Sequence, residues 1–154
     1  MGGVNNDGKA IIVDLDGTLC NIDHRIHLLV GRDSKEWHKF EDGCISDGVN
    51  GWAEHLITLY KVKAGYKILL VTGRTEKVRG LTEEWLLGHC IPYDELYMRP
   101  EGEDISDCKL KEKVYKEHIA GKYIVEFVVE DRKRVVEMWR RLGLTCLACA
   151  EGDY

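Results

Sequence analysis

The sequence predicts an α/β protein, a Rossmann-like three-layer sandwich in which a five-stranded parallel sheet carries helices on both faces. Short runs of Ile and Val alternate along the chain with segments whose apolar residues recur every three or four positions. Strands that alternate with helices are joined by right-handed crossovers, which leave neighbouring strands parallel. The length of 154 residues, without repeats or low-complexity tracts, fits a single domain over residues 1–154.

Each expected element has its own signal in the sequence. The first strand is the β-branched run AIIVDL. The first long helix has Trp52, Leu56 and Leu59 on one face and stops at Gly65, and Pro100 ends the third strand. In chain order we expect a strand at 10–15, a helix at 52–65, a strand at 66–74, a helix at 75–88, a strand at 95–100, a helix at 106–119, a strand at 123–132, a helix at 134–143 and a strand at 144–150.

Residues 18–50 lie outside this alternation. The segment is polar and aromatic and follows the first strand, so we expect a small cap with a couple of short helices rather than a globular lid. A small cap leaves the sheet edge open to large substrates. Within it, Trp37 and Phe40 either pack the cap onto the body, which we favour, or stack with His38 on a terminal nucleobase.

Composition excludes several classes of protein. The net charge of −5 and the 32% of charged residues indicate a mildly acidic surface rather than one that grips long nucleic acids. No apolar run approaches the ~18–20 residues of a membrane span. The start MGGVNNDGKA lacks the features of a secretory signal, so we expect a cytoplasmic protein without membrane contact.

The six cysteines are scattered, which favours free thiols in a reducing compartment. Cys146 and Cys149 are three residues apart in an expected strand and should point to opposite faces. No second pair of Cys or His completes a zinc site with them, so we interpret both as small packing residues.

Polar side chains gather where the expected strands end. In sheets of this kind, functional groups lie outside the carboxyl ends of the strands. Three strands and one preceding helix would therefore bring their residues to a common edge. These residues are Asp14 and Asp16 after the first strand, Thr72, Gly73 and Arg74 after the second, Glu130 and Asp131 after the fourth, and Lys109, Lys111 and Lys113 in the helix before it.

Several carboxylates this close together need a counter-charge, and hard oxygen ligands suit Mg²⁺. A metal held by Asp14, the carbonyl of Asp16 and Asp131 would leave positions open for a phosphoryl oxygen. Asp14 could then attack phosphorus, and Asp16 could exchange a proton with the leaving oxygen and with water. The Thr72 hydroxyl and a lysine would neutralise the phosphoryl oxygens. Gly17 would permit the tight turn between the two acids.

Four short motifs of the sequence resemble those of a known superfamily. VDLDGTL (13–19), VTGR (71–74), a following lysine and VVEDR (128–132) resemble, in order, the four motifs of the haloacid dehalogenase (HAD) superfamily of phosphohydrolases. The stretch from VVEDR to the final EGDY, with YMRPEGEDISD and KEKVYKEHI before it, more closely resembles the 3′-phosphatase domains of T-even bacteriophage polynucleotide kinases. The resemblance covers nearly the whole chain from Ala10 and is thinnest over residues 26–50.

The resemblance implies a role for each matching position. Asp14 corresponds to the nucleophile and Asp16 to the general acid/base, and both contribute to the metal site. Lys111, rather than Lys109 or Lys113, matches the phosphate-binding lysine. Further matches are Thr72, Gly73 and Arg74 as phosphate-binding residues, Arg25 as an arginine near the substrate, and Asp131 and Glu130 as metal carboxylates, with Glu130 standing where the family usually has Asp.

The expected function is therefore Mg²⁺-dependent removal of a 3′-phosphate from nucleic-acid ends through an aspartyl-phosphate. The alternatives are a nucleotidase or small-molecule phosphatase of the same superfamily and, more remotely, a non-catalytic binding module, which the intact motifs disfavour. The kinase loop G-x-x-x-x-G-K-[ST] is absent, so the chain is either a stand-alone phosphatase or part of a kinase-phosphatase. The choice between DNA, RNA and mononucleotides, the activity on cyclic phosphates, and the oligomeric state stay open. A phage origin would place the protein in the host cytoplasm.

Overall fold

The computed structural model describes residues 8–29 and 34–154. Its centre is a five-stranded sheet in the order β5-β4-β1-β6-β7, with all neighbouring strands parallel. The predicted α/β fold with a five-stranded parallel sheet is thereby confirmed. The strands are β1 (Lys9–Val13), β4 (Lys67–Thr75), β5 (Glu95–Arg99), β6 (Ile124–Arg132) and β7 (Cys146–Gly152).

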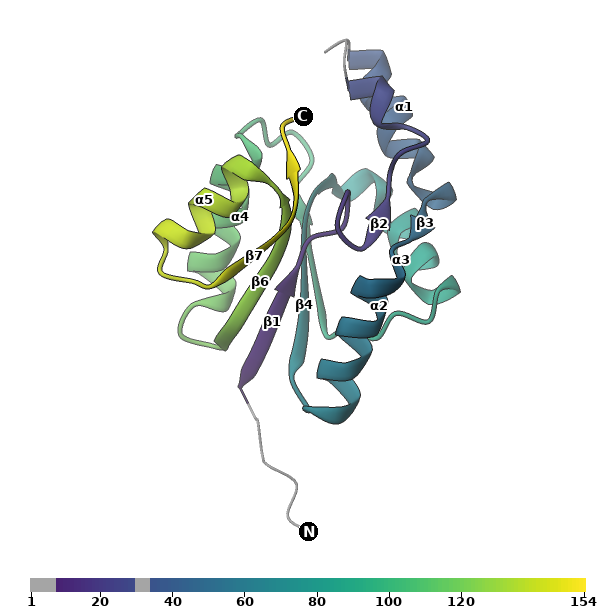
Figure 1. Cartoon of the computed structure of the whole chain (residues 1–154). Helices are drawn as coiled ribbons and strands as arrows, with labels where there is room; N and C mark the ends of the chain where they lie inside the picture. Colours follow the sequence, from purple (N-terminus) through teal and green to yellow (C-terminus); the bar gives the residue numbers. More distant parts are fainter. Residues whose placement is uncertain (1–7, 30–33) are drawn as a thin grey trace.

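Helices cover both faces of this sheet (Figure 1). On one face lie α2 (Gly51–Thr58) and α3 (Arg79–Gly88), and on the other lie α4 (Asp107–Val114) and α5 (Lys133–Arg141). Alternate residues of β1 supply the two cores because successive strand side chains point to opposite faces. Ile11 packs in the core that contains Trp85 of α3, and Ile12 packs in the core that contains Trp139 of α5.

The boundaries of three expected helices differ from the prediction. The helix expected at 52–65 is α2 continued by a π-helical turn (Leu59–Lys63), and α4 is likewise continued by a π-helical turn (Tyr115–Ile119). The helix expected from residue 75 begins later, because β4 extends to Thr75 and a short 3₁₀ turn (Glu76–Val78) precedes α3. The cap residue Glu41 accepts hydrogen bonds from both the amide and the hydroxyl of Thr75, which holds this residue extended.

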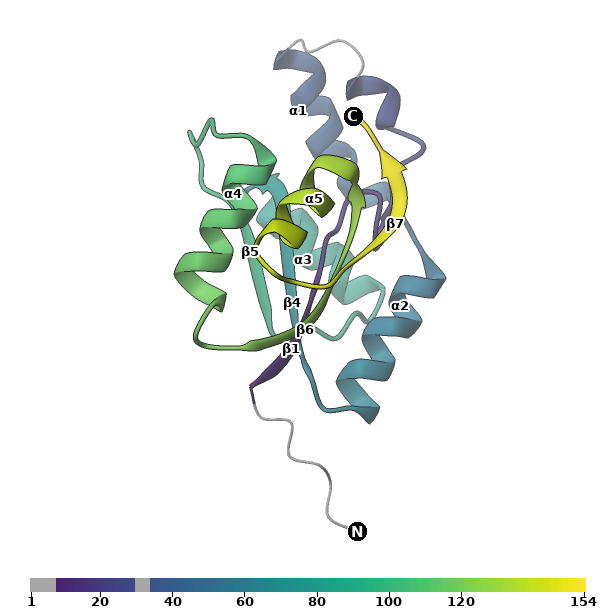
Figure 2. The same cartoon turned by 60° about the vertical axis from the view of Figure 1, so that its left-hand side comes forward.

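The cap lies above the carboxyl end of the sheet (Figures 1 and 2). In chain order it contains β2 (Cys20–Asn21), a 3₁₀ turn (Ile26–Leu29), α1 (Ser34–Asp42), a second 3₁₀ turn (Gly43–Ser46) and β3 (Gly48–Val49). The antiparallel pairing of β2 with β3 was not predicted. Phe40 is buried and packs the cap onto the body as expected. Trp37, in contrast, is 39% exposed and stacks on Phe40 with ring centroids 5.6 Å apart.

The chain ends and the cysteines complete the description. β7 carries the C-terminal residues to the same end of the molecule as the cap, away from the N-terminal end of β1 (Figure 1). All six cysteines are free thiols, with Cys146 buried and Cys149 exposed. Among the described residues, no helix combines the length and the apolar character needed to cross a membrane.

Candidate active site

The loop after β1 places two carboxylates at the centre of the carboxyl edge. The amide of Asp14 still bonds to Val129 of β6, and the chain then turns sharply at Gly17, whose φ is +80°. A side chain at Gly17 would be strained at this φ, and its Cβ would collide with the carboxylate of Asp131. Glycine at this position therefore lets the loop pass close to the end of β6.

Asp14, Lys111, Glu130 and Asp131 form one buried group, called here the Asp14 cluster. The Lys111 ammonium, from α4, donates to Asp14 Oδ1 at 2.7 Å and to Glu130 Oε2 at 2.8 Å. The other Glu130 oxygen accepts the amides of Asp131 and Arg132 at 3.1 and 3.2 Å. Both oxygens of Glu130 thus have protein donors, and its main contact is with the lysine.

The Asp14 cluster has too little positive charge to balance its acids, since one ammonium group faces three carboxylates. Burial, together with the charge of Glu130, raises the pKa of Asp14 to about 7. Burial also raises the pKa of Glu130 to about 7, and burial with the charge of Asp14 raises the pKa of Asp131 to about 6. Oxygens of Asp14, Glu130 and Asp131 lie within 4.8 Å of one another. A hard divalent cation such as Mg²⁺ fits this donor set and would supply the missing charge.

Two hydroxyl groups contact these carboxylates, and neither was singled out from the sequence. The Thr18 hydroxyl donates to Asp14 Oδ2 at 3.2 Å and lies 3.5 Å from Asp131 Oδ1. The Tyr154 hydroxyl donates to Asp131 Oδ2 and lies 3.3 Å from the carbonyl oxygen of Asp16. Within the described parts of the chain, no Lys or Arg forms an ion pair with Asp131. The two hydroxyl groups thus orient Asp131, and its negative charge stays available to a metal ion.

Asp16, Arg25, Asp47 and Arg74 form a second group, called here the arginine cluster. Arg25 and Arg74 each donate from Nη2 to Asp16 Oδ1 at 2.6 Å. Both also bind Asp47, at 2.6 and 3.0 Å. Burial alone would raise the pKa of Asp16, but the charges of Arg74 and Arg25 outweigh it and lower that pKa to about 2. Two cations balance two anions, so this cluster is neutral without a metal.

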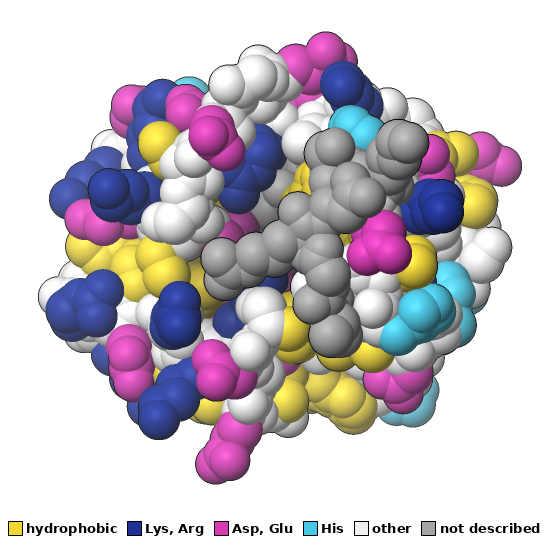
Figure 3. All heavy atoms as spheres, turned by 90° about the horizontal axis from the view of Figure 1, so that it is seen from above, with side chains coloured by type: hydrophobic (Ala, Val, Ile, Leu, Met, Phe, Trp, Pro, Cys, Tyr) yellow, Lys and Arg dark blue, Asp and Glu magenta, His cyan; other side chains and the backbone are white. Residues whose placement is uncertain are grey.

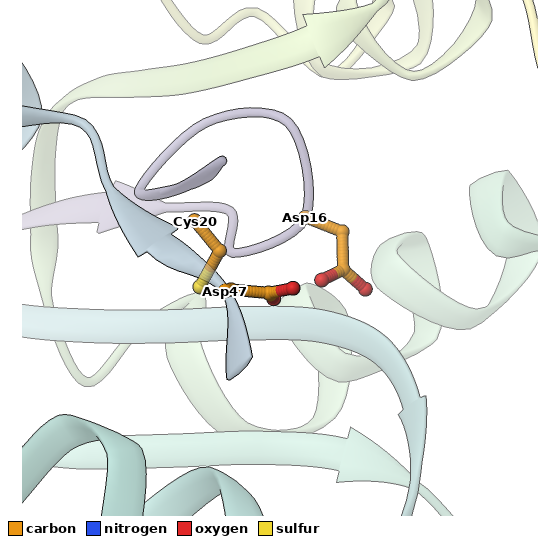
Figure 4. Close-up of side chains that lie close together, drawn as sticks. All are labelled: Asp16, Cys20 and Asp47. Atoms are coloured by element: carbon orange, nitrogen blue, oxygen red, sulfur yellow. The ribbon is translucent and has the colours of Figure 1, made fainter. Parts of the chain in front are cut away.

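Asp47 was missed by the sequence analysis. Its side chain is fully buried, His24 contacts it at 2.8 Å, and its backbone carbonyl accepts the indole N–H of Trp85. Figure 4 shows its carboxylate facing that of Asp16, with the Cys20 thiol beside it. Burial raises the pKa of Cys20, so the thiol stays neutral. The arginines already occupy both carboxylates, so these three residues do not make a metal site.

A further acid, Asp107, begins α4 and was also not predicted. Arg132 donates to its Oδ2 at 3.2 Å, and the Lys111 ammonium lies 3.4 Å from it. Gly73 approaches Asp107 so closely that a Cβ at this glycine would collide with the carboxylate. The sequence does contain a signal for the contact with the lysine, because residues four apart on a helix, such as Asp107 and Lys111, lie on the same face. Asp107 therefore links the lysine of its own helix to Arg132 at the end of β6.

These residues surround a small pocket beneath the cap, with a volume of about 60 Å³. Asp14, Thr72, Gly73 and Lys111 line its floor side, and Trp37 lies on the cap side. Figure 3 shows the end of the molecule at which the pocket lies, with Lys and Arg side chains gathered on the side of α4 and α5. The structure therefore gives the expected site one location, between the sheet edge and the cap.

The predicted site residues can be placed one by one. Asp14, Asp16, Thr72, Arg74 and Lys111 all line the pocket. Of the remaining predicted residues, Gly73 lines the pocket, Arg25 and Glu130 each contact one of these side chains, and Asp131 lies within 4.8 Å of Asp14. Of the other candidate lysines, Lys109 is exposed and Lys113 pairs with Glu103 at 3.6 Å.

Comparison with known proteins identifies the family. The family model described as the polynucleotide kinase PNKP phosphatase domain matches residues 8–154. A protein of Autographa californica nuclear polyhedrosis virus, whose name describes a bifunctional polynucleotide kinase/RNA ligase, is 28% identical over 150 residues. These residues make up 95% of this chain but 20% of the viral protein.

Solved structures agree with this family. A chain from the Pnkp1/Rnl/Hen1 RNA repair complex matches with a TM-score of 0.82 and 35% identity, over 100% of this chain and 46% of its own length. A chain from a second structure of the Pnkp1/Rnl/Hen1 complex matches with a TM-score of 0.79 and 37% identity. This match covers 96% of this chain and 47% of the other. A HAD family enzyme from Bacteroides thetaiotaomicron matches with a TM-score of 0.53 and 12% identity, over 94% of this chain and 95% of the enzyme. At this low identity the match supports the fold alone.

The chain thus spans about half the length of the two matching chains from the RNA repair complex and a fifth of the viral protein. The family match confirms the resemblance that VDLDGTL, VTGR and VVEDR indicated. The family model covers the sheet, the cap and every residue of both charged clusters. The chain therefore belongs to the family of PNKP phosphatase domains and is a phosphatase with the HAD fold.

Proposed function

We propose that this domain removes the 3′-phosphate from nucleic-acid ends, with Mg²⁺ as cofactor and a phosphoryl group carried transiently by Asp14. The observation that carries the proposal is the Asp14 cluster, in which a buried carboxylate is held by Lys111 at 2.7 Å at the wall of a small pocket. The family membership supports the reaction class, and the relatives' names point to polynucleotides.

Asp14, Asp131 and the backbone carbonyl of Asp16 would hold the metal ion. When bound, Mg²⁺ would neutralise the charge of the carboxylates and of the phosphate as they approach each other. Glu130 is the least suited of the predicted ligands, because its two oxygens accept from Lys111 and from backbone amides. We therefore propose that Glu130 acts by positioning Lys111.

In the first step an oxygen of Asp14 attacks phosphorus, and the bond from phosphorus to the 3′-oxygen breaks. Lys111 and the Thr72 hydroxyl stabilise the charge on the phosphoryl oxygens. The leaving 3′-oxygen takes a proton from Asp16. In the second step water attacks the aspartyl-phosphate and gives a proton to Asp16, which releases phosphate and restores the Asp14 carboxylate.

The arginine cluster bears directly on the proton transfers of Asp16. In the free protein Arg25 and Arg74 hold the pKa of Asp16 at about 2, so its carboxylate is deprotonated and only weakly basic before substrate binds. A bound phosphate brings negative charge next to Asp16 and draws on the same arginines. Both effects raise the pKa of Asp16, so substrate binding favours the protonated acid that the first step needs.

The cap favours a substrate larger than a metabolite. Trp37 lies at the pocket, and with 39% of its surface exposed it can stack on a nucleobase. Its other face rests on Phe40, whose ring in turn lies 4.1 Å from the Arg25 guanidinium. The stack on Phe40 fixes the indole before substrate arrives, which lowers the entropy lost on binding.

The test is phosphate release in the presence of Mg²⁺ from four substrates at equal concentration. These are a 3′-phosphorylated oligonucleotide, its 5′-phosphorylated counterpart, and the 3′- and 5′-mononucleotides. We expect the 3′-phosphorylated oligonucleotide to give the highest kcat/KM. Equal or faster turnover of mononucleotides would contradict the proposal and indicate a nucleotidase with the same Asp14 chemistry.

A further inference from the structure

A second hollow adjoins the catalytic pocket on the side of α5. Its volume is about 240 Å³, against about 60 Å³ for the catalytic pocket. The two spaces share three wall residues, Asp107, Arg132 and Tyr154. The catalytic pocket is the smaller of the two spaces, and a nucleotide chain bound with its terminal phosphate there has to continue beyond it. The adjoining hollow is large enough to receive part of that continuation.

Two arginines line this hollow. Arg132 separates it from the catalytic pocket, donates to Asp107 at 3.2 Å and lies 4.7 Å from the centre of the Tyr154 ring. Its Nε–H and the Asp107 Oδ1 on the same wall are both buried without a hydrogen-bond partner in the described parts of the chain, so this wall is not fully satisfied. Arg134, in the first turn of α5, is exposed and makes no ion pair with any described residue.

Two acids line the hollow as well, and they differ in how they are compensated. Asp107 is paired with Lys111, Arg132 and Arg99, so its charge is already balanced. Asp153 is exposed and makes no ion pair with the described residues. The attraction of the hollow for an anion therefore depends on Arg134, with a contribution from Arg132, and is opposed by Asp153.

We propose that this hollow binds the internucleotide phosphate that precedes the 3′-terminal nucleotide, with Arg134 as its contact. The inference rests on the proposed function and names the feature that separates chains from mononucleotides. Neighbouring phosphates in a chain are one nucleotide apart, and the hollow begins at the wall of the pocket that receives the terminal phosphate. A mononucleotide with only a 3′-phosphate has no group for this hollow.

The experiment compares three substrates with wild-type protein and Arg134→Ala. They are a 3′-phosphorylated dinucleotide, the same dinucleotide with a neutral methylphosphonate linkage, and a nucleoside 3′-monophosphate. For the charged dinucleotide we expect KM to rise about three- to tenfold with kcat unchanged. The neutral dinucleotide and the mononucleotide should not respond. The dependence of log(kcat/KM) on log salt should weaken by about 0.7 for the charged dinucleotide alone.

Two further variants control for general charge effects. Lys133→Ala removes the same charge from the adjacent position of α5, but Lys133 lines a different hollow beside β7. It should leave all three substrates unaffected. Asp153→Asn removes the opposing charge and should lower KM for the charged dinucleotide.

Either of two results would overturn the inference while leaving the proposed function intact: equal responses to Arg134→Ala and Lys133→Ala, or equal responses of the charged and neutral dinucleotides. If the wild-type protein releases no phosphate from the charged dinucleotide, the proposed function itself fails, and this inference fails with it.

Discussion

Two clusters of buried charge meet at the end of β1, and they differ in how their charges balance. In the arginine cluster, Arg25 and Arg74 face Asp16 and Asp47, so two cations neutralise two anions. In the Asp14 cluster, a single ammonium faces three carboxylates. Asp14 and Asp16 are two residues apart, yet the pKa of one is raised to about 7 and that of the other is lowered to about 2.

This difference separates what each cluster can do. The charges of the arginine cluster balance, so the cluster has no need of a metal ion. Its ion pairs hold Asp16 in a fixed position. The Asp14 cluster has more carboxylates than cations. It therefore favours either protonation of a carboxylate or the binding of a cation. Paired carboxylates whose surroundings push their pKa values apart are a common basis for distinct catalytic roles.

Asp14→Asn tests whether the Asp14 cluster carries the chemistry. The amide keeps the shape of the side chain but removes the nucleophile, so phosphate release should fall about 10⁴-fold or more. The thermal midpoint should hold or rise, because one of three crowded carboxylates loses its charge. Asp104→Asn, an exposed acid away from the pocket, is the matched control and should retain activity. Undiminished turnover by Asp14→Asn would exclude Asp14 as the nucleophile.

Asp47→Ala tests whether the arginine cluster is a structural unit. The change leaves two buried guanidinium groups with one carboxylate between them, which should lower the free energy of unfolding by about 3–5 kcal/mol. Denaturant titration of both proteins measures this. Glu83→Ala removes an exposed partner of Arg79 and should cost about 1 kcal/mol or less. A similar small loss for Asp47→Ala would mean that water readily replaces this carboxylate.

Asp14, Glu130 and Asp131 should make stability depend on pH in the absence of metal. Their pKa values in the folded protein, about 7, 7 and 6, lie above the ordinary values of 3.8 and 4.5. A raised pKa contributes stability that is present below pH 4 and is lost as the pH rises through 6 to 7. Mg²⁺ binds the deprotonated form and should offset this loss.

The difference between the thermal midpoints in Mg²⁺ and in chelator should therefore grow from pH 5 to pH 8. Asp131→Asn, which removes one proposed ligand, should make this difference small at every pH. A midpoint difference that is the same at pH 5 and pH 8 would show that these carboxylates do not titrate in the metal-free protein.

The residues of the Asp14 cluster could be predicted from the sequence, whereas part of the arginine cluster could not. Asp14, Lys111 and Asp131 follow or precede strands, and parallel strands bring their carboxyl ends to one edge. Their neighbourhood could therefore be predicted from the order of the elements. Asp47 lies in a cap without a regular pattern, and its partners are 22 and 27 residues away in the chain. Nothing local marks it as a buried anion.

The other contacts that the sequence did not indicate also join residues far apart in the chain. Tyr154 meets Asp16 across 138 residues and Asp131 across 23, through the course of β7 beyond the end of β6. Glu41, which is 34 residues away in the chain, accepts a hydrogen bond from the amide of Thr75 and so keeps this residue in β4. The helix expected from residue 75 therefore begins later. Contacts of this kind depend on how the cap and the last strand fold over the sheet edge, and periodicity within a segment carries no information about them.

Tyr154→Phe gives the smallest effect and concerns the one carboxylate of the Asp14 cluster without a cation partner. The substitution keeps the ring beside Arg132 but removes the hydroxyl that donates to Asp131. One hydrogen bond contributes about 0.5–1.5 kcal/mol, so kcat/KM should fall about two- to tenfold, and more Mg²⁺ should be needed for half-maximal thermal stabilisation. Tyr154→Ala, which also frees Arg132, should cost more. An effect of Tyr154→Phe as large as that of Asp14→Asn would contradict this account, because a hydroxyl that only orients Asp131 leaves its negative charge in place for the metal.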